Sequence, residues 1–407
     1  MLASSSRSAP EGRFPRIDMT SRYPVTAYAL CNALGATTAA VIGSLRAGQS
    51  GLRPCELDVP FAAKTGTVPG PLEAPPASLG PWDTRLVRIA LRCLDELAPR
   101  IDAARSRWGR ERIAVILGTS TAGIEETERA WGVRKRTGSF PAAYDWDRQH
   151  ACHALLEVVR KRTGLHGPCW IISTACSSSG KAFATAHRLL DAGACDAVLV
   201  GGVDSLCQTT LRGFHSLELL SEGACRPFAA DRKGINIGEG CALALLERTG
   251  EAAAALLGEG ETSDAHHMTA PHPEGVGARA AMEQALARAG LLAEQVDHID
   301  AHGTGTVLND AAEGRAIREL WGDRVPVVST KGYTGHLLGA AGATEALFSI
   351  LAIEQGWIPA SLGAEPVDAR LGIWVATSLL QRRCRVVLSN SFAFGGSNVS
   401  LAFGAAA

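Results

Sequence analysis

The sequence predicts an α/β protein in which helices cover the faces of a sheet. Short apolar runs rich in β-forming residues alternate with small-residue helical stretches through most of the 407 residues, as expected for such an architecture. The 44 glycines cluster at strand ends, where close backbone approach and positive φ are useful. The expected strands are 112–120, 168–174, 195–205, 241–247, 296–304, 325–332 and 384–404. The expected helices are 83–98, 150–163, 177–192, 278–290, 310–321 and 340–355.

Two parts of the chain are organised alike. In each part a helix rich in alanine precedes a strand of the type "DAVLVGGVDS" or "CRVVLSNSFAFGGSN", and a second strand follows, "CALALLE" or "VSLAFG". This pattern predicts an internal duplication with a boundary near residue 250. We therefore expect one half over 23–250 and a second over 251–407. Residues 1–22 are polar and lack the apolar core of a secretory signal, which predicts a disordered extension and leaves Met1 and Met19 as alternative starts.

Composition excludes several classes of protein. A formal net charge of −1 argues against a nucleic-acid binder that relies on a global basic field. No apolar run reaches 18 residues, so we expect no membrane span. Eleven scattered cysteines, an odd number without a CxxC pair, favour reduced thiols in the cytoplasm over a disulfide framework and indicate no zinc site.

The stretch "WIISTACSSSGKAF", residues 170–183, places a cysteine between a predicted strand and a predicted helix. Cys176 is expected at or near the helix N-terminus, where free backbone N–H groups and the helix dipole favour a nucleophilic thiolate. The alternative is an inert cysteine in a buried turn of small residues.

Three further segments end a short strand in a polar, glycine-rich turn. "IDAHGTGT" carries His302, "VVSTKGYTGHLLGAAG" carries Lys331 and His336, and "LSNSFAFGGSN" carries two phenylalanines at alternate positions. Each has a structural alternative, a hydrogen-bonding histidine or a core aromatic pair. None has the spacing of a nucleotide-binding loop. One cysteine and two histidines, each at a strand-to-turn junction, together favour covalent thiol catalysis.

Six motifs in order resemble the elongating β-ketoacyl-acyl-carrier-protein synthases. They are "STACSSSGKA", "RPFAADRKGINIGEGCALALLE", "TSDAHHMTAPHPEG", "AHGTGTVLND", "STKGYTGHLLGAAG" and "NSFAFGGSN". The resemblance covers residues 22 to 405. It implies a thiolase-like, five-layered αβαβα fold of two duplicated halves, usually dimeric.

The resemblance also implies a role for each motif residue. Cys176 resembles the nucleophile that accepts the acyl chain, and His302 and His336 resemble the pair that promotes malonyl decarboxylation. Lys331 and Glu313 match the supporting lysine and acidic residue. The implied oxyanion hole is formed by the backbone N–H groups of Cys176 and Phe394, with Phe394 as a gate. The expected substrate-binding residues are Thr304, Thr306, Phe392 and Gly395.

The same resemblance bears on substrate and partners. The Cys-His-His set implies decarboxylative condensation of an acyl group with malonyl-acyl-carrier protein, and no metal or organic cofactor. "LGTSTAGIEE" and "APHPEG" look closer to synthases of aryl-polyene or xanthomonadin-like pigment clusters. The partner is then a homodimer mate or a synthase-like chain-length subunit. One alternative is a housekeeping fatty-acid synthase. Another is a non-catalytic partner subunit, which is expected to lack the nucleophile, whereas this chain keeps it. A third is a thiolase-type enzyme, which would need a second cysteine where this chain has Phe394.

A carrier protein is acidic, so its docking site should be basic. The candidates are Arg85 and Arg88 on helix 83–98 and the predicted loop Arg134, Lys135 and Arg136. Their attraction would weaken with salt. The alternative is an ordinary solvated charged face.

Overall fold

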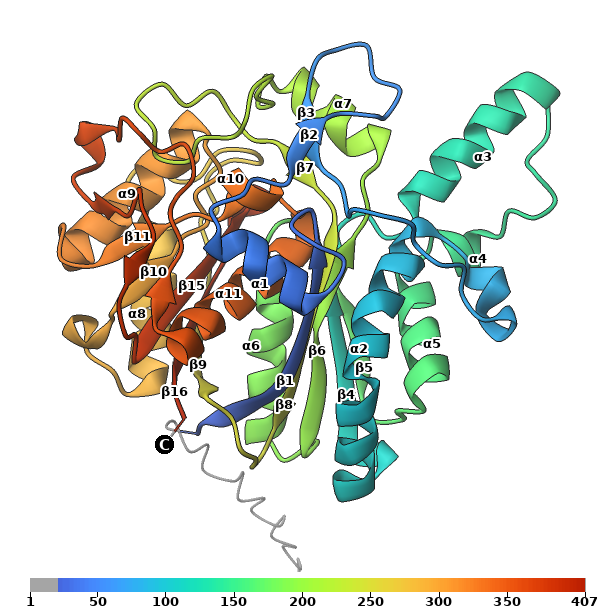
Figure 1. The fold of residues 1–407 in the computed structure, drawn as a ribbon, viewed down its shortest axis with the longest axis horizontal. Helices are drawn as coiled ribbons and strands as arrows, with labels where there is room; N and C mark the ends of the chain where they lie inside the picture. Colours follow the sequence, from blue (N-terminus) through green and yellow to red (C-terminus); the bar gives the residue numbers. More distant parts are fainter. Residues whose placement is uncertain (1–20, 407) are drawn as a thin grey trace, which may run out of the picture.

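The computed structural model describes residues 21–406 and shows a layered α/β architecture (Figure 1). The expected disordered extension over 1–22 lies, except for its last two residues, outside this described part, as does the alternative start at Met19. No helix of residues 21–406 combines the length and apolar character needed to cross a bilayer.

The first half is built on a five-stranded sheet. Its strands are β1 (Tyr23–Asn32), β4 (Ile113–Gly118), β5 (Cys169–Ile172), β6 (Ala197–Asp204) and β8 (Gly240–Glu247), in the order β1-β8-β6-β4-β5. β4 runs parallel to β5 and β6, whereas β8 is antiparallel to β6 and β1. β5 is therefore an edge strand.

The second half repeats this pairing pattern. Its strands are β9 (Ala254–Ser263), β10 (His298–Asp300), β11 (Pro326–Val328), β13 (Trp374–Val375), β15 (Val386–Ala393) and β16 (Ser397–Ala405). β10 is parallel to β11 and β15, and β16 is antiparallel to β15 and β9. A short pairing of Tyr23–Pro24 with Ala255–Leu256 joins the two halves into one 11-stranded sheet. The predicted α/β class with duplicated halves is confirmed.

Helices form the other three layers. α6 (Ser178–Asp191) and α11 (Ala341–Gln355) pack on each other between the two halves of the sheet. α2 (Arg85–Trp108) and α5 (Cys152–Thr163) cover the outer face of the first half, and α8 (Val276–Ala289) and α9 (Val307–Trp321) cover that of the second. The central helices touch at Gly180 and Gly342, where a Cβ on Gly342 would lie 2.7 Å from the Gly180 nitrogen. Side chains at this crossing would force the two helices apart.

Shorter elements complete the chain. The helices are α1 (Thr38–Arg46), α3 (Ile124–Thr137), α4 (Trp146–Gln149), α7 (Gln208–Ser216) and α10 (Lys331–Thr334). Short 3₁₀ helices are η1 (Ala77–Trp82), η2 (Arg110–Arg112), η3 (Ala293–Gln295), η4 (Leu338–Ala340), η5 (Ala369–Leu371) and η6 (Phe394–Gly396). One small sheet contains β2 (Leu52–Pro54), β3 (Lys64–Gly66) and β7 (Ile237–Gly238). A second contains β12 (Trp357–Ile358) and β14 (Leu380–Gln381).

The expected strand 384–404 is a pair of antiparallel strands, β15 and β16, separated by η6, and the last two residues of the expected strand 325–332 begin α10. A further difference lies in the predicted docking loop. Residues 134–136 were expected in a loop, but they form the last turn of α3, which projects from the body together with the chain leading to α4 (Figure 1). The first turn of α3 carries Glu125 and Glu126 and its last turn carries three basic residues, an arrangement that complements the helix dipole. Because few apolar residues mark this helix, hydrophobic periodicity did not indicate it.

Candidate active site

Cys176 lies on a sharp turn between β5 and α6. Ala175, which precedes it, has a φ of 51°, a left-handed conformation that is unfavourable for a residue with a Cβ. The turn is held locally, because the Ser178 hydroxyl donates to the Ala175 carbonyl at 2.6 Å and accepts from the Thr174 N–H at 2.9 Å. α6 begins two residues later, at Ser178, so the cysteine is close to a helix N-terminus as predicted.

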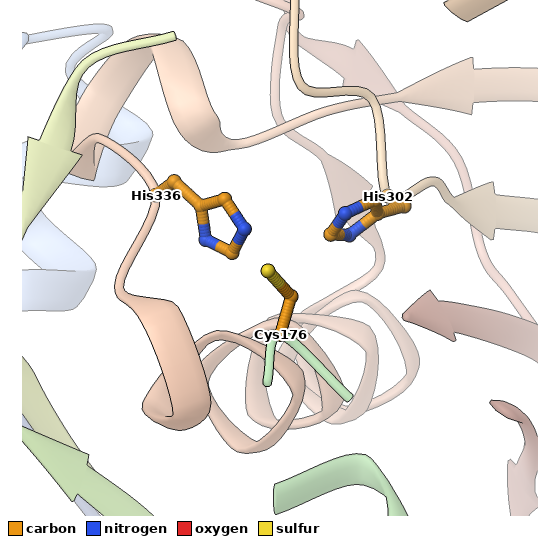
Figure 2. Close-up of side chains that lie close together, drawn as sticks. All are labelled: Cys176, His302 and His336. Atoms are coloured by element: carbon orange, nitrogen blue, oxygen red, sulfur yellow. The ribbon is translucent and has the colours of Figure 1, made fainter. Parts of the chain in front are cut away.

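The thiol of Cys176 points between two imidazole rings (Figure 2). Ligand-capable atoms of Cys176, His302 and His336 all lie within 4.8 Å of one another. The two rings are nearly perpendicular, with centroids 5.3 Å apart. Cys176 and His336 come from loops beside the central helices, and His302 follows β10, so both halves of the fold contribute to this group.

Hydrogen bonds fix the tautomer of each histidine. The Leu338 N–H donates to Nδ1 of His336 at 3.2 Å, and the Lys331 ammonium group lies 3.4 Å from Nδ1 of His302. Each ring accepts at Nδ1, so its proton is on Nε2. Nε2 of His336 is buried and has no hydrogen-bond partner among the described residues. A buried N–H without a partner is a donor available to a substrate oxygen.

Both imidazoles are held neutral. Burial lowers the pKa of His302 and of His336 well below the usual histidine value, and the nearby positive charge of Lys331 lowers both further. Neutral rings with Nε2–H can donate a hydrogen bond without first losing or gaining a proton.

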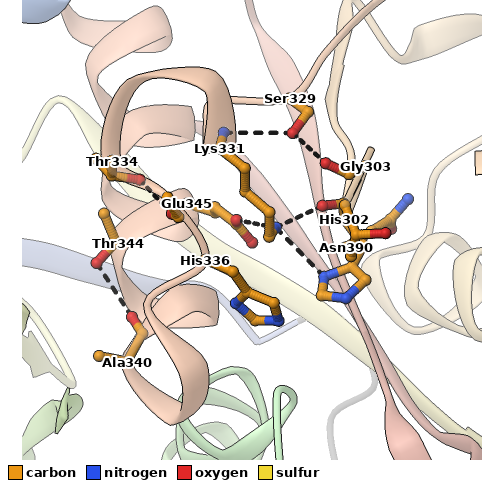
Figure 3. A network of polar contacts seen from close by, with 12 residues as sticks. His302, Gly303, Ser329, Lys331, Thr334, His336, Ala340, Thr344, Glu345 and Asn390 are labelled. Atoms are coloured by element: carbon orange, nitrogen blue, oxygen red, sulfur yellow. Dashed lines mark hydrogen bonds and ion pairs between the residues drawn. The ribbon is translucent and has the colours of Figure 1, made fainter. Parts of the chain in front are cut away.

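Lys331 is the centre of a buried polar network (Figure 3). Its ammonium group donates to the His302 carbonyl and pairs with Glu345 of α11. Burial raises the pKa of Glu345 to about 7, and the pairing with Lys331 opposes this rise. Glu345 was not predicted from the sequence, although one carboxylate in the apolar helix "GAAGATEALFSILAI" is a signal for a paired buried charge.

Glu313 holds the backbone rather than the rings. Its carboxylate accepts from the N–H groups of His302 at 2.9 Å and Gly303 at 2.7 Å. Asn390 lies 3.3 Å from the same carboxylate. Burial raises the pKa of Glu313 to about 7. Its contacts assign it to positioning the His302 turn.

Asp204, a second residue missed from the sequence, organises the opposite side of the site. At the end of β6, its buried carboxylate accepts from the Thr119 hydroxyl at 2.6 Å, the Thr121 N–H at 3.0 Å and the Gly339 N–H at 2.6 Å. Gly339 is three residues after His336. Asp204 thus ties the turn that carries His336 to the loop after β4.

We expect Asp204→Asn to lower the catalytic rate constant about tenfold while leaving the KM for the substrate within twofold. The amide keeps the size but loses the charged acceptor of the Gly339 N–H, a hydrogen bond worth about 1.5–3 kcal/mol. Steady-state kinetics would measure both constants. Asp196→Asn, the same change in a carboxylate that pairs with Arg112 and Arg248 near the surface, is the control. Equal effects of the two variants would contradict a specific role for Asp204.

The thiolate expected at Cys176 is opposed by burial. The side chain is buried, and burial raises the pKa of the thiol to about 11, although Lys331 and a hydrogen bond from the Phe394 backbone both lower it. Burial therefore favours the protonated thiol, against the thiolate favoured by the helix start alone.

The rate of Cys176 alkylation by iodoacetamide should therefore rise about tenfold per pH unit between pH 7 and 9, without a plateau. The reason is that only the thiolate reacts, and its fraction grows with pH until the pKa near 11 is approached. Peptide mapping of the modified protein would follow Cys176 separately from the other cysteines. A plateau below pH 8 would show that the pKa is instead depressed.

A cavity of about 230 Å³ leads to the Cys176 thiol. Three of the predicted substrate-binding residues, Thr304, Thr306 and Phe392, line it, as does Phe394. Gly395 does not line it; its N–H instead donates to the Met268 carbonyl at 2.7 Å. The Phe394 ring lies 5.6 Å from that of Phe214, so the turn at Phe394 forms part of the cavity wall.

The predicted docking residues are not gathered at this cavity. Arg85 makes a bidentate ion pair with the fully buried Glu239. Arg88 forms an ion pair with Asp83 at 2.6 Å. Arg134 lies over the rings of two aromatic residues of the projecting α3 segment. Lys135 and Arg136 are exposed on the same helix turn.

Comparisons with known proteins identify the family. Residues 84–252 match the N-terminal domain of β-ketoacyl synthases, and residues 253–365 match their C-terminal domain. The chain is 32% identical to 3-oxoacyl-[acyl-carrier-protein] synthase 2 of Mycobacterium bovis, over 93% of this chain and 96% of the relative. It is 35% identical to nodulation protein E of Rhizobium meliloti, over 72% of this chain and 75% of the relative.

Solved structures agree with this similarity. A chain from the complex of the ketosynthase ApeO with its chain length factor ApeC, from Xenorhabdus doucetiae, superposes with a TM-score of 0.90 at 38% identity, covering 98% of this chain and all of the other. The ishigamide ketosynthase/chain length factor gives a TM-score of 0.86 at 27% identity, over 95% of this chain and all of the other. These ketosynthases and this chain share the thiolase fold, and the chain belongs to the β-ketoacyl synthase family of acyltransferases.

Proposed function

We propose that this synthase condenses an acyl group, held as a thioester on Cys176, with malonyl-acyl-carrier protein to give 3-oxoacyl-carrier protein. The observation that carries the proposal is the buried group of one thiol and two neutral imidazoles at the end of a cavity. In the first half-reaction, the Cys176 sulfur attacks the carbonyl of the acyl thioester. A Cys176–acyl bond forms, and the phosphopantetheine thiol leaves with the proton that the cysteine gives up.

The second half-reaction uses the two histidines. The bond between the malonyl carboxylate and the adjacent carbon breaks, carbon dioxide leaves, and the electron pair forms an enolate. Nε2–H of His302 and His336 would stabilise the enolate oxygen. The enolate carbon then attacks the acyl–Cys176 carbonyl, and the sulfur leaves as thiolate, which takes up one proton from solvent to restore the thiol. Because each group donates from a dry, fixed position, no reorganisation of water is needed as charge develops.

The backbone N–H groups of Cys176 and Phe394 are the proposed oxyanion hole for both tetrahedral intermediates. In support, the Phe394 backbone lies near enough to the Cys176 sulfur to favour its ionised form and lower its pKa. A group that favours negative charge at the sulfur is close to the position that a thioester oxygen takes during attack.

Intact-protein mass spectrometry tests the function. Incubation with a panel of acyl-carrier proteins, saturated and aryl-enoyl, should add the mass of the acyl group to the wild-type chain and not to Cys176→Ala. Addition of malonyl-carrier protein should then discharge the adduct and release carbon dioxide. Loading that persists in Cys176→Ala would overturn the assignment of the nucleophile.

The acyl group that we propose is aryl-polyenoyl, for a pigment pathway rather than housekeeping fatty-acid synthesis. Its support is the resemblance of "LGTSTAGIEE" and "APHPEG" to synthases of that kind. Preferential loading of aryl-enoyl groups in the same panel would support it, and preference for saturated chains would contradict it. The eleven cysteines are all free thiols, which supports a reducing compartment such as the cytoplasm.

A second subunit is proposed at the β5 edge. β5 has no strand on its outer side among the described residues, and Trp170 on it is 47% exposed. Unpaired edges with exposed aromatic residues are ready to pair with another chain. The similarity to ketosynthase and chain length factor complexes supports a synthase-like partner, and an alternative role as the non-catalytic member is disfavoured by the intact Cys176.

Trp170→Glu is expected to shift the assembled dimer to monomer, because a carboxylate would be buried without a partner at the strand edge. Analytical ultracentrifugation of the chain alone and with its candidate partner would measure this. Trp374→Glu, at an exposed tryptophan of the other sheet edge, is the matched control. Unchanged assembly of Trp170→Glu would exclude this interface.

A further inference from the structure

The thiol and the two imidazoles at the end of the cavity have the ligand types and the spacing of a zinc site. One ligand-capable atom from each of Cys176, His302 and His336 lies within 4.8 Å of the other two. Within residues 21–406, no other three histidine, cysteine or carboxylate side chains meet in this way. Thiolate sulfur and imidazole nitrogen are ligands that Zn²⁺ and related thiophilic ions prefer. An ion bound here would occupy the Cys176 sulfur and leave no free thiol in the cavity.

The protons on the two imidazoles oppose such binding. Nδ1 of His336 accepts from the Leu338 N–H at 3.2 Å, and Nδ1 of His302 lies 3.4 Å from the Lys331 ammonium group. Both rings therefore carry their proton on Nε2, whereas a neutral imidazole binds a metal ion through its unprotonated nitrogen. Binding at Nε2 would move the proton to Nδ1, where it would face a second N–H donor. Each ring would exchange a hydrogen bond for a contact between two donors, which is unfavourable in a buried site.

The backbone turn that carries the Leu338 N–H is held in place. Leu338 has a φ of 55°, a left-handed conformation that is unfavourable for a residue with a Cβ. Before it, the His336 N–H donates to the Asn236 carbonyl at 2.7 Å. After it, the Gly339 N–H donates to the Asp204 carboxylate at 2.6 Å. Because both sides are tied, the Leu338 N–H cannot turn away from Nδ1 without breaking these bonds.

The Lys331 ammonium group opposes metal binding in a second way, through its charge. It is buried, and its contacts with the His302 carbonyl and Glu345 fix its position beside the rings (Figure 3). Its charge lowers the pKa of Cys176, His302 and His336, so its field reaches all three ligand groups. That field favours the thiolate that a metal ion also needs. At comparable distances, however, it repels an ion of two positive charges more strongly than it attracts a sulfur of one negative charge.

We propose that Lys331, together with the Leu338 N–H, protects Cys176 from Zn²⁺ and other thiophilic divalent ions. The two donors keep the imidazole protons on Nε2, and the lysine keeps a positive charge beside the site. This role goes beyond the proposed condensation, since it concerns the enzyme without substrate. The protons that would serve as donors in the reaction also cover the lone pairs that a metal ion needs.

Protection of Cys176 from iodoacetamide by Zn²⁺ tests the proposal, with peptide mapping to follow this cysteine alone. The wild type is compared at one fixed pH with the double variant Lys331→Met and Glu345→Gln, which removes the donor and both charges of the ion pair. The Zn²⁺ concentration that halves the alkylation rate should be at least about tenfold lower in the double variant, because one opposing hydrogen bond and one repulsive charge are gone. Co²⁺ should give this variant a thiolate-to-metal absorption band, which should vanish when Cys176→Ala is added.

Two further variants serve as controls. Lys331→Arg keeps a positive charge and N–H donors, and its half-protecting Zn²⁺ concentration should stay within about threefold of wild type. Lys181→Met with Glu261→Gln removes a lysine–glutamate pair, 3.5 Å apart, whose residues do not line the cavity. This second control should protect Cys176 no better than wild type.

Four results would overturn the proposal. The first is an equal half-protecting concentration in the wild type and the double variant, and the second is binding by Lys331→Arg as tight as that of the double variant. The third is a double variant that is folded by urea titration yet gains no Zn²⁺ protection. The fourth is a Co²⁺ band that persists after Cys176→Ala, which would place the ion elsewhere. Failure of the wild type to load any acyl group would instead reject the proposed function and leave the metal measurement unaffected.

Discussion

In a His336→Ala variant, Cys176 is expected to load its acyl group at a rate within about threefold of wild type, while condensation falls roughly 100- to 1,000-fold. The size of the effect is that of removing one preorganised donor to a developing oxyanion. The expectation follows from the buried Nε2 of His336, which has no hydrogen-bond partner among residues 21–406. Acyl loading by mass spectrometry and carbon dioxide release from malonyl-carrier protein would measure the two steps separately.

His267→Ala is the control for this variant, because its ring is exposed on the loop before Thr269. Equal loss of loading and of decarboxylation in His336→Ala would mean that the ring positions the thiol rather than the enolate. His302→Ala should lose condensation to a similar degree.

The second large effect is expected for Lys331→Met. Removing one partner of a buried ion pair typically costs about 3–5 kcal/mol when the other stays charged. Glu345, already with a pKa raised to about 7, would escape part of this cost by taking up a proton. The loss of stability should therefore be small at pH 6, where the Glu345 carboxyl is mostly protonated, and should grow toward pH 9, because without Lys331 the folded state resists an ionisation that the unfolded chain undergoes freely. Urea-unfolding midpoints across this range would measure it.

The double variant Lys331→Met with Glu345→Gln separates stability from catalysis. It removes the unpaired carboxylate, so the pH-dependent loss of stability should disappear. Condensation should remain on the order of 100-fold below wild type, because His302 no longer has the donor that fixes its tautomer. Recovery of activity together with stability would show that Lys331 has only a structural role.

Sequence patterns predicted the parts of this protein that depend on local order. The strand-to-turn junctions at Cys176, His302 and His336 were recognisable because each follows an apolar run and precedes glycine or small residues. The structure brings all three to one cavity. The duplication was also visible, because the two halves repeat their order of strands and helices.

Features that depend on distant contacts could not be predicted in this way. Asp204 and Glu345 are single carboxylates whose partners lie 135 and 14 residues away, respectively, and no spacing rule links them. Arg85 was taken as a surface charge because its partner, Glu239, follows it by 154 residues. α3 was missed because most of its surface is polar. Burial also raises the pKa of Cys176, where the nearby helix N-terminus predicted a lowered one. Burial is a property of the whole fold, so no local pattern could indicate it.

The division of the proposed catalytic group between the duplicated halves has an evolutionary consequence. Cys176 comes from the first half, whereas both histidines come from the second. A copied gene could lose the cysteine and keep a folded chain, since the sheet pairing and the helix crossing at Gly180 and Gly342 do not involve its side chain. Such a copy would retain the β5 edge and the cavity wall. One mutation could thus turn a catalytic chain into a non-catalytic subunit that only contributes to the shape of its partner chain's cavity. Selection could then act on the two chains as a unit.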